Sequence, residues 1–155
     1  PESQLDRFLL RLRIGYPPPQ VEMRLLLEGN ADTARAVPTV LDPAKLVTLQ
    51  LQVDRVTIET SLLSYTHALV QATRNAPVLS LGTSTRGAMA LARAARARAL
   101  VRGRTYCIPD DIHDLAVPVL AHRVRLSTHA DGFVPSRDEA EAAVRDIVAR
   151  VPVPV

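Results

Sequence analysis

The sequence predicts a mainly α-helical protein with an aliphatic core, and three observations carry that prediction. Apolar residues recur at helical spacing in six segments, several of these segments begin at Asp, Ser or Pro capping signals, and aromatic residues make up only 3% of the chain. With no Trp, the core has to be built from Leu, Val and Ala. A chain of 155 residues is one domain in length, or one small domain with fragments attached.

The six expected helices each follow from local signals. Pro43 after Asp42 opens the second helix, and Pro109 ahead of two acids opens the fifth. Ser136 begins a capping box ahead of the sixth, and Gly103 is placed to end the fourth as a C′ glycine. The first four expected helical spans are 20–28, 43–54, 59–74 and 86–102. The fifth helix is expected to start at Pro109 and to have His122 and Arg123 at its C-terminal end, and the sixth follows the capping box at 136–139 and carries the apolar residues from Ala140 to Val148. Inward-facing residues are expected to include Val21, Leu25, Leu26, Leu62, Leu63, Leu69, Val70, Ala88, Leu91, Ala92, Ala95, Ala99, Ile112, Leu115, Ala116, Val119, Leu120, Ala140, Ala143, Val144, Ile147 and Val148.

Residues 8–14 alternate between apolar and basic side chains, which predicts a strand. Leu10, Leu12 and Ile14 would lie on one face and the arginines between them on the other. A lone strand has no sheet to join, and the first residue is not Met, so we expect an excised piece of a longer protein. Without its sheet, such a strand should be disordered, re-pack on the helices, or pair with another chain through its open edge.

Composition excludes several classes of function. The net charge of +3 comes from many arginines and one lysine, Lys45, which is typical of a high-GC bacterial genome and only a weak sign of a polyanionic partner. The single cysteine, Cys107, excludes an internal disulfide framework and is expected in the core. No segment has transmembrane length, and the N-terminus has no signal-peptide pattern. The histidines, His67, His113, His122 and His129, show no metal-ligand spacing, so no metal site is expected.

Residues 81–87 place small hydroxylated side chains and one arginine just before the long Ala/Arg helix. Ser84 or Thr85 is a good N-cap, so Arg86 falls in the first helical turn. A cation there faces the positive end of the helix dipole and costs roughly 0.3–1 kcal/mol, unless an anion such as phosphate lies beside it. The other interpretation is a solvated surface arginine.

Three segments together resemble the MoxR family of AAA+ ATPases, and the resemblance covers residues 1–127. Residues 1–8 (PESQLDRF) with 14–17 (IGYP) are similar to the end of the family's nucleotide-binding core. Residues 81–86 (LGTSTR) are similar to its second sensor, commonly G-x-S-x-R. Residues 106–112 (YCIPDDI) with 121–124 (AHRV) are similar to the last part of its helical lid.

The resemblance implies a role for each of these segments. Arg86 matches the sensor-2 arginine, which reaches the γ-phosphate from the lid, with Ser84 and Thr85 beside it on the nucleotide side. Arg7 matches the arginine finger, which acts on the ATP of a neighbouring subunit. Asp6 would orient Arg7 or support the subunit interface. The implied division is a core remnant over 1–17 with the last core strand, a helical lid over 18–127, and a C-terminal helix with an extended tail over 128–155.

The chain departs from the family pattern in three places. It has no G-x-x-x-x-G-K-[ST] loop and no apolar strand ending in paired acids for Mg²⁺, so this sequence lacks the phosphate cradle and the metal site. Thr85 stands where the family commonly has Pro, and Ile108 stands where it has Thr, which loses a cap of roughly 1 kcal/mol. We therefore expect the chain alone to be inactive and to hold no cofactor.

For the longer protein, the resemblance implies ATP and Mg²⁺ bound between core and lid. It further implies a homo-oligomeric ring, a hexamer, that acts in the cytoplasm as a chaperone on client proteins not readable from the sequence. The competing hypothesis is a non-enzymatic helical module that binds nucleic acid or a protein partner through the arginines of the fourth helix. Those arginines are Arg93, Arg96, Arg98, Arg102 and Arg104. Nucleic acid is the less favoured partner, because aromatic and Asn/Gln readout residues are missing nearby.

Overall fold

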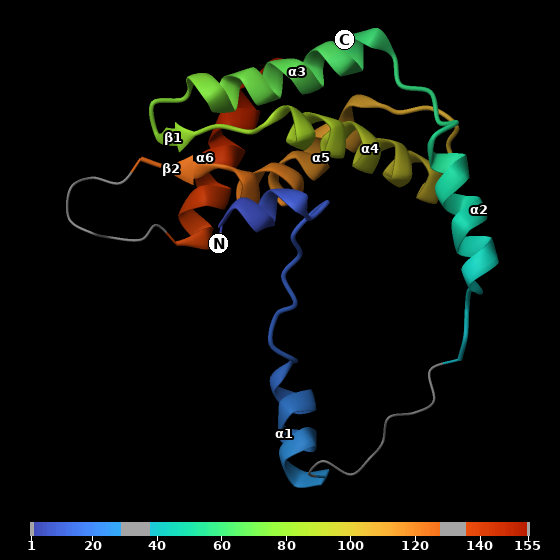
Figure 1. The fold of residues 1–155 in the computed structure, drawn as a ribbon. Coiled ribbons are helices and arrows are strands. Elements are labelled where there is room, and N and C mark those ends of the chain that lie inside the picture. The colour runs from blue at the N-terminus through green and yellow to red at the C-terminus, as the bar shows by residue number, and fades with distance from the viewer. Residues whose placement is uncertain (1, 29–37, 128–135, 155) are drawn as a thin grey trace.

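The computed structural model describes residues 2–28, 38–127 and 136–154, and within them the chain is mainly α-helical (Figure 1). The elements in chain order are the 3₁₀ helix η1 (Glu2–Arg7), α1 (Pro19–Glu28), α2 (Pro43–Val53), α3 (Thr60–Asn75), β1 (Leu79–Leu81), α4 (Thr85–Val101), α5 (Pro109–Leu120), the 3₁₀ helix η2 (Ala121–Arg123), β2 (Arg125–Leu126) and α6 (Arg137–Arg150). All six expected helices form, which confirms the predicted fold class.

Helices α3 to α6 build one bundle around an aliphatic core. Helix α4 packs against both α3 and α5, and α6 packs against α5 and α3. The largest fully buried apolar side chains are Leu69, Leu91, Ile112, Leu120, Val70, Val119 and Val144. Ala95 and Ala99 are also fully buried, so the α4 backbone comes close to its neighbours. The expected aliphatic composition of the core is confirmed.

The helix ends carry the expected capping contacts. The Asp42 carboxylate accepts from the Lys45 N–H at 2.8 Å, and Ser136 and Glu139 form the reciprocal bonds of a capping box. Gly103 follows the last turn of α4 with φ 74°, a conformation that a Cβ disfavours. Most helix boundaries could therefore be predicted to within a residue or two from their own sequence, but α5 ends at Leu120 and its expected last residues form the 3₁₀ helix η2 instead.

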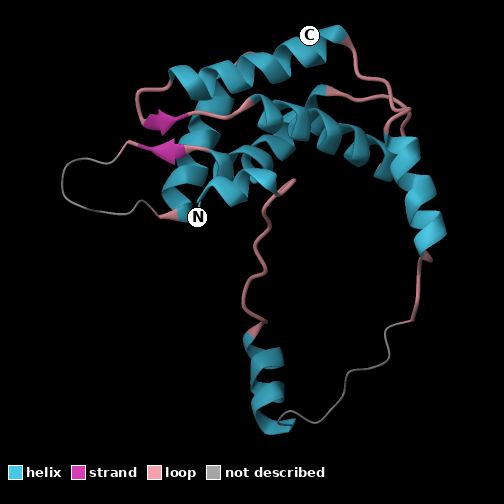
Figure 2. Cartoon of the chain, viewed as in Figure 1, coloured by secondary structure: helices cyan, strands magenta, loops and turns pink. Residues whose placement is uncertain are grey.

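Two short β contacts tie the connecting loops together. Strands β1 and β2 pair antiparallel (Figure 2), and the Ser127 N–H donates to the Val78 carbonyl just beyond them at 2.9 Å. A parallel bridge joins Thr57 to Tyr106, so the loop before α3 lies against the loop before α5. The first contact sets the segment before α4 beside the segment after η2, which positions the candidate site.

The strand expected over residues 8–14 does not form. Among the described residues no strand lies beside this segment, and η1 precedes it. The Arg11 N–H donates to the Pro118 carbonyl at 2.9 Å and Leu10 packs on the core, whereas Ile14 is 99% exposed. Alternation of side chains predicts a strand only if a neighbouring strand pairs with its backbone groups. The segment instead re-packs on the bundle, which is one of its three expected outcomes.

Helix α1 stands away from the bundle, whereas α2 lies against the end of α4 (Figure 1), and neither helix has a buried residue. The expectation that Leu25 and Leu26 face inward is therefore wrong, since they are 54% and 75% exposed. Leu63 on α3 is also exposed rather than inward-facing. The loop expected over 31–41 lies outside the described residues except at 38–41, as do residues 128–135 with His129. Within the described parts of the chain, no helix is both long and apolar enough to cross a bilayer.

Candidate functional site

The turn before α4 is anchored to the C-terminal end of α3. The Thr83 N–H donates to Thr73 Oγ1 at 3.0 Å, and Arg74 Nε donates to the Thr83 carbonyl at 2.8 Å. Gly82 lies so close to α3 that an added Cβ would be 2.5 Å from the Arg74 Cα. Because the neighbouring atoms are backbone, only glycine fits here without a shift of the helix. Close packing against α3 thus explains why the first residue of the G-x-S-x-R pattern is glycine.

Ser84 caps α4 and also reaches the N-terminal segment. Its Oγ accepts from the Gly87 N–H at 3.2 Å and donates to the Asp6 carboxylate at 3.2 Å. An added Cβ on Gly87 would lie 2.3 Å from Thr83 Cγ2 and 3.1 Å from Arg123 Cδ. The start of α4 is therefore closely packed against both the preceding turn and η2.

Arg86 lies in the first turn of α4 with its side chain exposed. The first turn contains no acidic residue, and within the described residues the Arg86 side chain makes neither a hydrogen bond nor an ion pair. The Asp6 carboxylate reaches this end of the helix dipole through Ser84, but it is bonded to Arg123 and forms no ion pair with Arg86. Thr85, the preceding residue, is exposed as well.

Arg123 holds the N-terminal segment on the bundle. Its guanidinium donates to both the main-chain carbonyl and the carboxylate of Asp6, at 2.8 and 3.0 Å, and to the carbonyls of Phe8 and Leu9. Its Nε donates to the Val119 carbonyl at 2.8 Å. The Arg123 side chain is 1% exposed and that of Asp6 is 30% exposed, so the ion pair is largely shielded from water. This contact could not be predicted from the sequence, because it joins residues more than a hundred positions apart.

Arg7 ends η1 with its side chain exposed, hydrogen-bonded to Gln4 Oε1 at 3.2 Å. The Asp6 carboxylate bonds to Arg123 and Ser84, and it makes no side-chain contact with Arg7 among the described residues. Asp6 and Ser84 are the predicted residues that the structure brings into contact. Arg7 and Arg86 flank this contact along the chain without contacting each other.

These segments line a groove of about 940 Å³ between η1, the α4 start, η2 and the α6 start. Its arginines are Arg11, Arg74, Arg123, Arg125 and Arg137, and its hydroxyl side chains are Ser80, Thr83, Ser84, Thr85 and Ser136. Asp6 is the one carboxylate that the described part of the chain contributes to the lining. Within the described chain Arg123 is paired with Asp6 and Arg137 with Glu141, so part of this positive charge is already compensated inside the protein.

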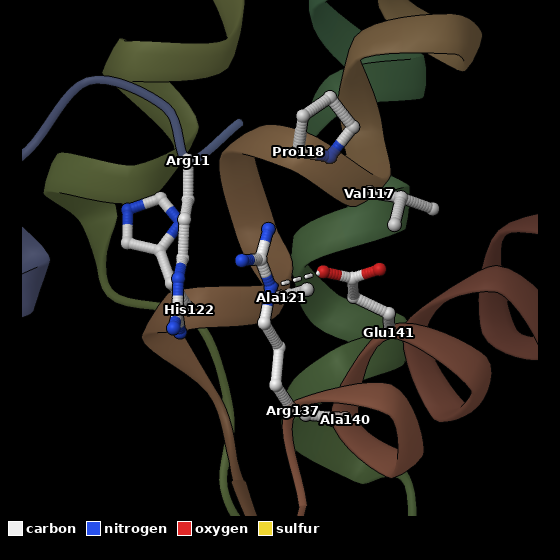
Figure 3. A pocket seen from close by; sticks show the side chains of 8 residues that line it. All are labelled: Arg11, Val117, Pro118, Ala121, His122, Arg137, Ala140 and Glu141. Atoms are coloured by element: carbon white, nitrogen blue, oxygen red, sulfur yellow. Dashed lines mark hydrogen bonds and ion pairs between the residues drawn. The ribbon is translucent and has the colours of Figure 1, made fainter. Parts of the chain in front are cut away.

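A small pocket of about 40 Å³ lies next to this groove (Figure 3), with room for little more than a water molecule. His122 lines it, and its Nε2 bonds to the Phe8 carbonyl at 3.1 Å while its buried Nδ1 has no partner among the described residues. Burial lowers the pKa of His122, and the Arg123 cation lowers it further. Arg137 Nε donates to Glu141 at 2.7 Å across the pocket. We assign this pocket a structural role.

A second buried charge cluster joins α4 to the start of α5. Asp111 is fully buried and receives two bonds of 2.7 Å from Arg104 and one of 2.9 Å from the Ile108 N–H. Burial alone would raise the pKa of Asp111, but these bonds outweigh it and hold the pKa below its usual range. Ile108 cannot act as a side-chain cap, as expected, yet its own N–H is satisfied by Asp111.

This cluster also bears on the arginine-rich helix. Arg98 bonds to Asp114 and to the Asp110 carbonyl, and Arg104 is committed to Asp111. Two of the five arginines of the competing hypothesis are therefore paired within the protein. Cys107 is buried and burial raises its pKa, as expected for a core thiol. In the described ranges, no group of three or more His, Cys, Asp or Glu side chains could hold a metal ion.

The comparisons with known proteins agree with this geometry. The AAA lid domain family matches residues 71–147, from the end of α3 through most of α6. The chain also superimposes with a TM-score of 0.82 on the crystal structure of a candidate ATPase from Cytophaga hutchinsonii, at 28% identity over 100% of this chain and 49% of the other. The bundle is an AAA lid domain.

Three curated relatives narrow the family. The uncharacterized protein YeaC of Bacillus subtilis is 41% identical over 100% of this chain and 48% of its own length. The chaperone MoxR1 of Mycobacterium tuberculosis is 33% identical over 84% of this chain and 37% of its own length. The protein MoxR of Paracoccus denitrificans is 40% identical over 47% of this chain and 21% of its own length. The chain belongs to the MoxR-type AAA+ ATPases and is their lid region. It spans about half the length, or less, of the curated relatives it matches.

Proposed function

We propose that this chain is the lid of a full-length ATPase in which Arg86 contacts the γ-phosphate of bound ATP as the sensor-2 residue. The observation that supports this is the position of Arg86: an exposed guanidinium in the first turn of α4, without an ion pair to any described residue. A phosphate there would relieve the repulsion between the cation and the helix dipole, and could also accept from the amides of Thr85 and Arg86.

Arg7 fits the second proposed role, that of an arginine finger acting on the ATP of a neighbouring subunit. Its side chain is exposed, with Gln4 as its one hydrogen-bond partner in the described chain, while the residues on either side of it are bound to Arg123. A guanidinium held on a fixed backbone and directed outward can neutralise charge that develops on a transferred phosphoryl group.

The wider activity follows from the same family. We propose a ring, a hexamer, that binds ATP and Mg²⁺ between core and lid in the cytoplasm and uses hydrolysis to remodel or mature client proteins. The Mycobacterium tuberculosis relative, named a chaperone, supports this role. The proposed division is a core remnant over 1–17, a lid over 18–127 and a C-terminal helix with its tail over 128–155. The phosphate loop and the Mg²⁺ ligands would come from the core, since this chain contains neither motif.

The test is steady-state ATPase activity of the full-length protein with Arg86→Ala. We expect kcat to fall by about a hundredfold or more, because the lost guanidinium acts on the charge of the transferred group. Arg93→Ala is the matched control, since it removes an exposed arginine from the same helix. This chain alone should be inactive and should restore activity when mixed with the remaining segment.

Three results would count against the proposal. An active Arg86→Ala protein would remove the role of Arg86 but leave the family unchanged. A full-length protein without ATPase activity would overturn the enzymatic proposal. Binding of this chain to generic DNA that weakens with salt and with Arg93→Ala would favour the helical binding module instead.

A further inference from the structure

The structure points to Arg123 and Asp6 as positioning residues for Arg7, joined through Ser84 to the helix that carries Arg86. We call Asp6, Ser84 and Arg123 the latch. The inference rests on the proposed finger role of Arg7. It adds that Arg7, which would act on the ATP of a neighbouring subunit, and Arg86, which would act on the ATP of its own subunit, are coupled by a contact between the N-terminal segment and the lid.

The first argument is the way Arg123 holds the main chain around Arg7. Its guanidinium donates to the carbonyl of the residue before Arg7, Asp6, and to the carbonyls of the two residues after it, Phe8 and Leu9. His122 Nε2 adds a second bond to the Phe8 carbonyl. The backbone is thus fixed on both sides of Arg7 while the Arg7 side chain remains exposed.

The second argument is that Arg123 is committed to this contact. Its side chain is 1% exposed, and its Nε is satisfied by the Val119 carbonyl at 2.8 Å. A buried guanidinium is costly unless its donors are paired, and the N-terminal segment supplies the acceptors for both terminal nitrogens. Displacing the segment would leave Arg123 unpaired, so the segment has one strongly favoured position.

The third argument is the continuation of the contact to α4. The Asp6 carboxylate accepts from both Arg123 Nη1, at 3.0 Å, and Ser84 Oγ, at 3.2 Å. Ser84 is the N-cap of α4, two residues before Arg86. A shift of the α4 start caused by phosphate at Arg86 would therefore act on Asp6, and through it on the backbone that carries Arg7.

The decisive experiment is a double-mutant cycle in the full-length ATPase. We expect Asp6→Ala to lower kcat by about tenfold, because a misplaced finger loses orientation, while KM for ATP changes by less than about twofold. In an Arg7→Ala background the same change should have almost no further effect, because Asp6 then has no finger to position. Asp146→Ala is the control, since it removes an exposed carboxylate whose ion pair within the described chain is with Arg150.

A second readout does not depend on activity. In the nucleotide-free protein, amide exchange of residues 7–11 should be faster in Asp6→Ala than in the parent, and unchanged in Asp146→Ala. Arg123→Lys should behave like Asp6→Ala, because an ammonium keeps the charge but cannot reach the same carbonyls as a planar fork. If Asp6→Ala fails to fold, Asp6→Asn keeps the side-chain shape and gives the same comparison at smaller amplitude.

Failure of the latch and failure of the proposed function are distinguishable. If Arg7→Ala and Arg86→Ala both lower kcat but Asp6→Ala does not, the function stands and the latch is wrong. An equal loss from Asp6→Ala in both backgrounds shows a merely structural role and also overturns the latch. If Arg7→Ala has no effect, the finger assignment and the latch fall together, while Arg86→Ala still tests the sensor.

Discussion

His122 is a residue whose charge state is set by its surroundings. Burial lowers its pKa below the ordinary 6.5, with the Arg123 cation acting in the same direction, and the bond to the Phe8 carbonyl offsets this only in part. Because the pKa is depressed in the folded state, the contribution of His122 to stability is present above pH 6.5 and is lost as the pH falls through the folded-state pKa.

We expect an NMR titration of the His122 ring to give a pKa below 6.5. The free energy of unfolding should decrease on acidification in this range, and His122→Gln should remove that part of the pH dependence while keeping a donor near the Phe8 carbonyl. A ring that titrates at the ordinary value would show that the pocket is open to water and that this assignment is wrong.

Gly82 provides a test of the turn that carries Ser84. A Cβ at this position would meet the backbone of Arg74 and Thr73 at 2.5 to 2.8 Å, so α3 or the turn would have to move. We expect Gly82→Ala to lower the free energy of unfolding by about 1–3 kcal/mol in a urea titration. Gly15→Ala, with nothing within 4 Å of the added Cβ, should change it by less than about 0.5 kcal/mol. Equal effects would mean that the turn is not held against α3.

At the scale of whole elements, Asp111 joins the end of α4 to the start of α5. We expect Asp111→Asn to lower the free energy of unfolding by about 2–3 kcal/mol at neutral pH, because the Arg104 guanidinium then has no carboxylate partner. Asp110→Asn, an exposed change in the same helical turn, should cost less than about 1 kcal/mol through the helix dipole alone. Urea titrations of the two variants make the comparison.

The pH dependence of the same element has a definite sign. The folded-state pKa of Asp111 lies below the reference value of 3.8, so its contribution is complete above that pH and disappears as the pH falls through the folded-state pKa. The Asp111→Asn protein should therefore lose less stability on acidification than the parent. An identical acid profile in both would contradict the assigned ion pair.

The helices could be predicted from the sequence because their signals are local. Asp42, Ser84 and Ser136 cap the helices that they were expected to cap, and Gly103 ends α4. The strand over 8–14 could not be predicted correctly, because strand formation depends on a partner elsewhere in space. The apolar stripe of α1 likewise predicted a helix but not what covers it, and within the described chain its leucines remain exposed.

In the candidate site, too, features that depend on neighbouring residues could be predicted, and contacts between distant segments could not. Arg86 and Ser84 were found from the capping pattern and the resemblance, because both depend on neighbours within four residues. Arg123 and Asp111 were missed as buried partners, since their ion pairs join segments that approach each other only in the folded chain. A signal for Arg123 was present: together with His122 it interrupts an apolar run from Val119 to Val124, which indicates polar side chains that need buried partners.

At the scale of the whole molecule, a lid must be rigid within itself and hinge against its core. The α3–α6 bundle supplies the rigidity through its shared aliphatic core, and the contacts of Arg123 extend it to residues 6–9. Helix α4, which carries Arg86, and residues 6–9 are therefore held together in this structure. If the proposed roles of Arg86 and Arg7 hold, the two arginines of one subunit would move together.

The alanine face of α4 has a consequence for how this protein can evolve. Ala94, Ala95 and Ala99 are at most 4% exposed, so almost every larger side chain reached by one nucleotide change would collide with the bundle. Arg93 and Arg102 of the same stretch are exposed and meet no such limit, whereas Arg98 is held by Asp111 and Asp114. A mutational scan should therefore show slow change at the three alanines and at Arg98, and faster change at Arg93 and Arg102, where lineages can acquire new contacts.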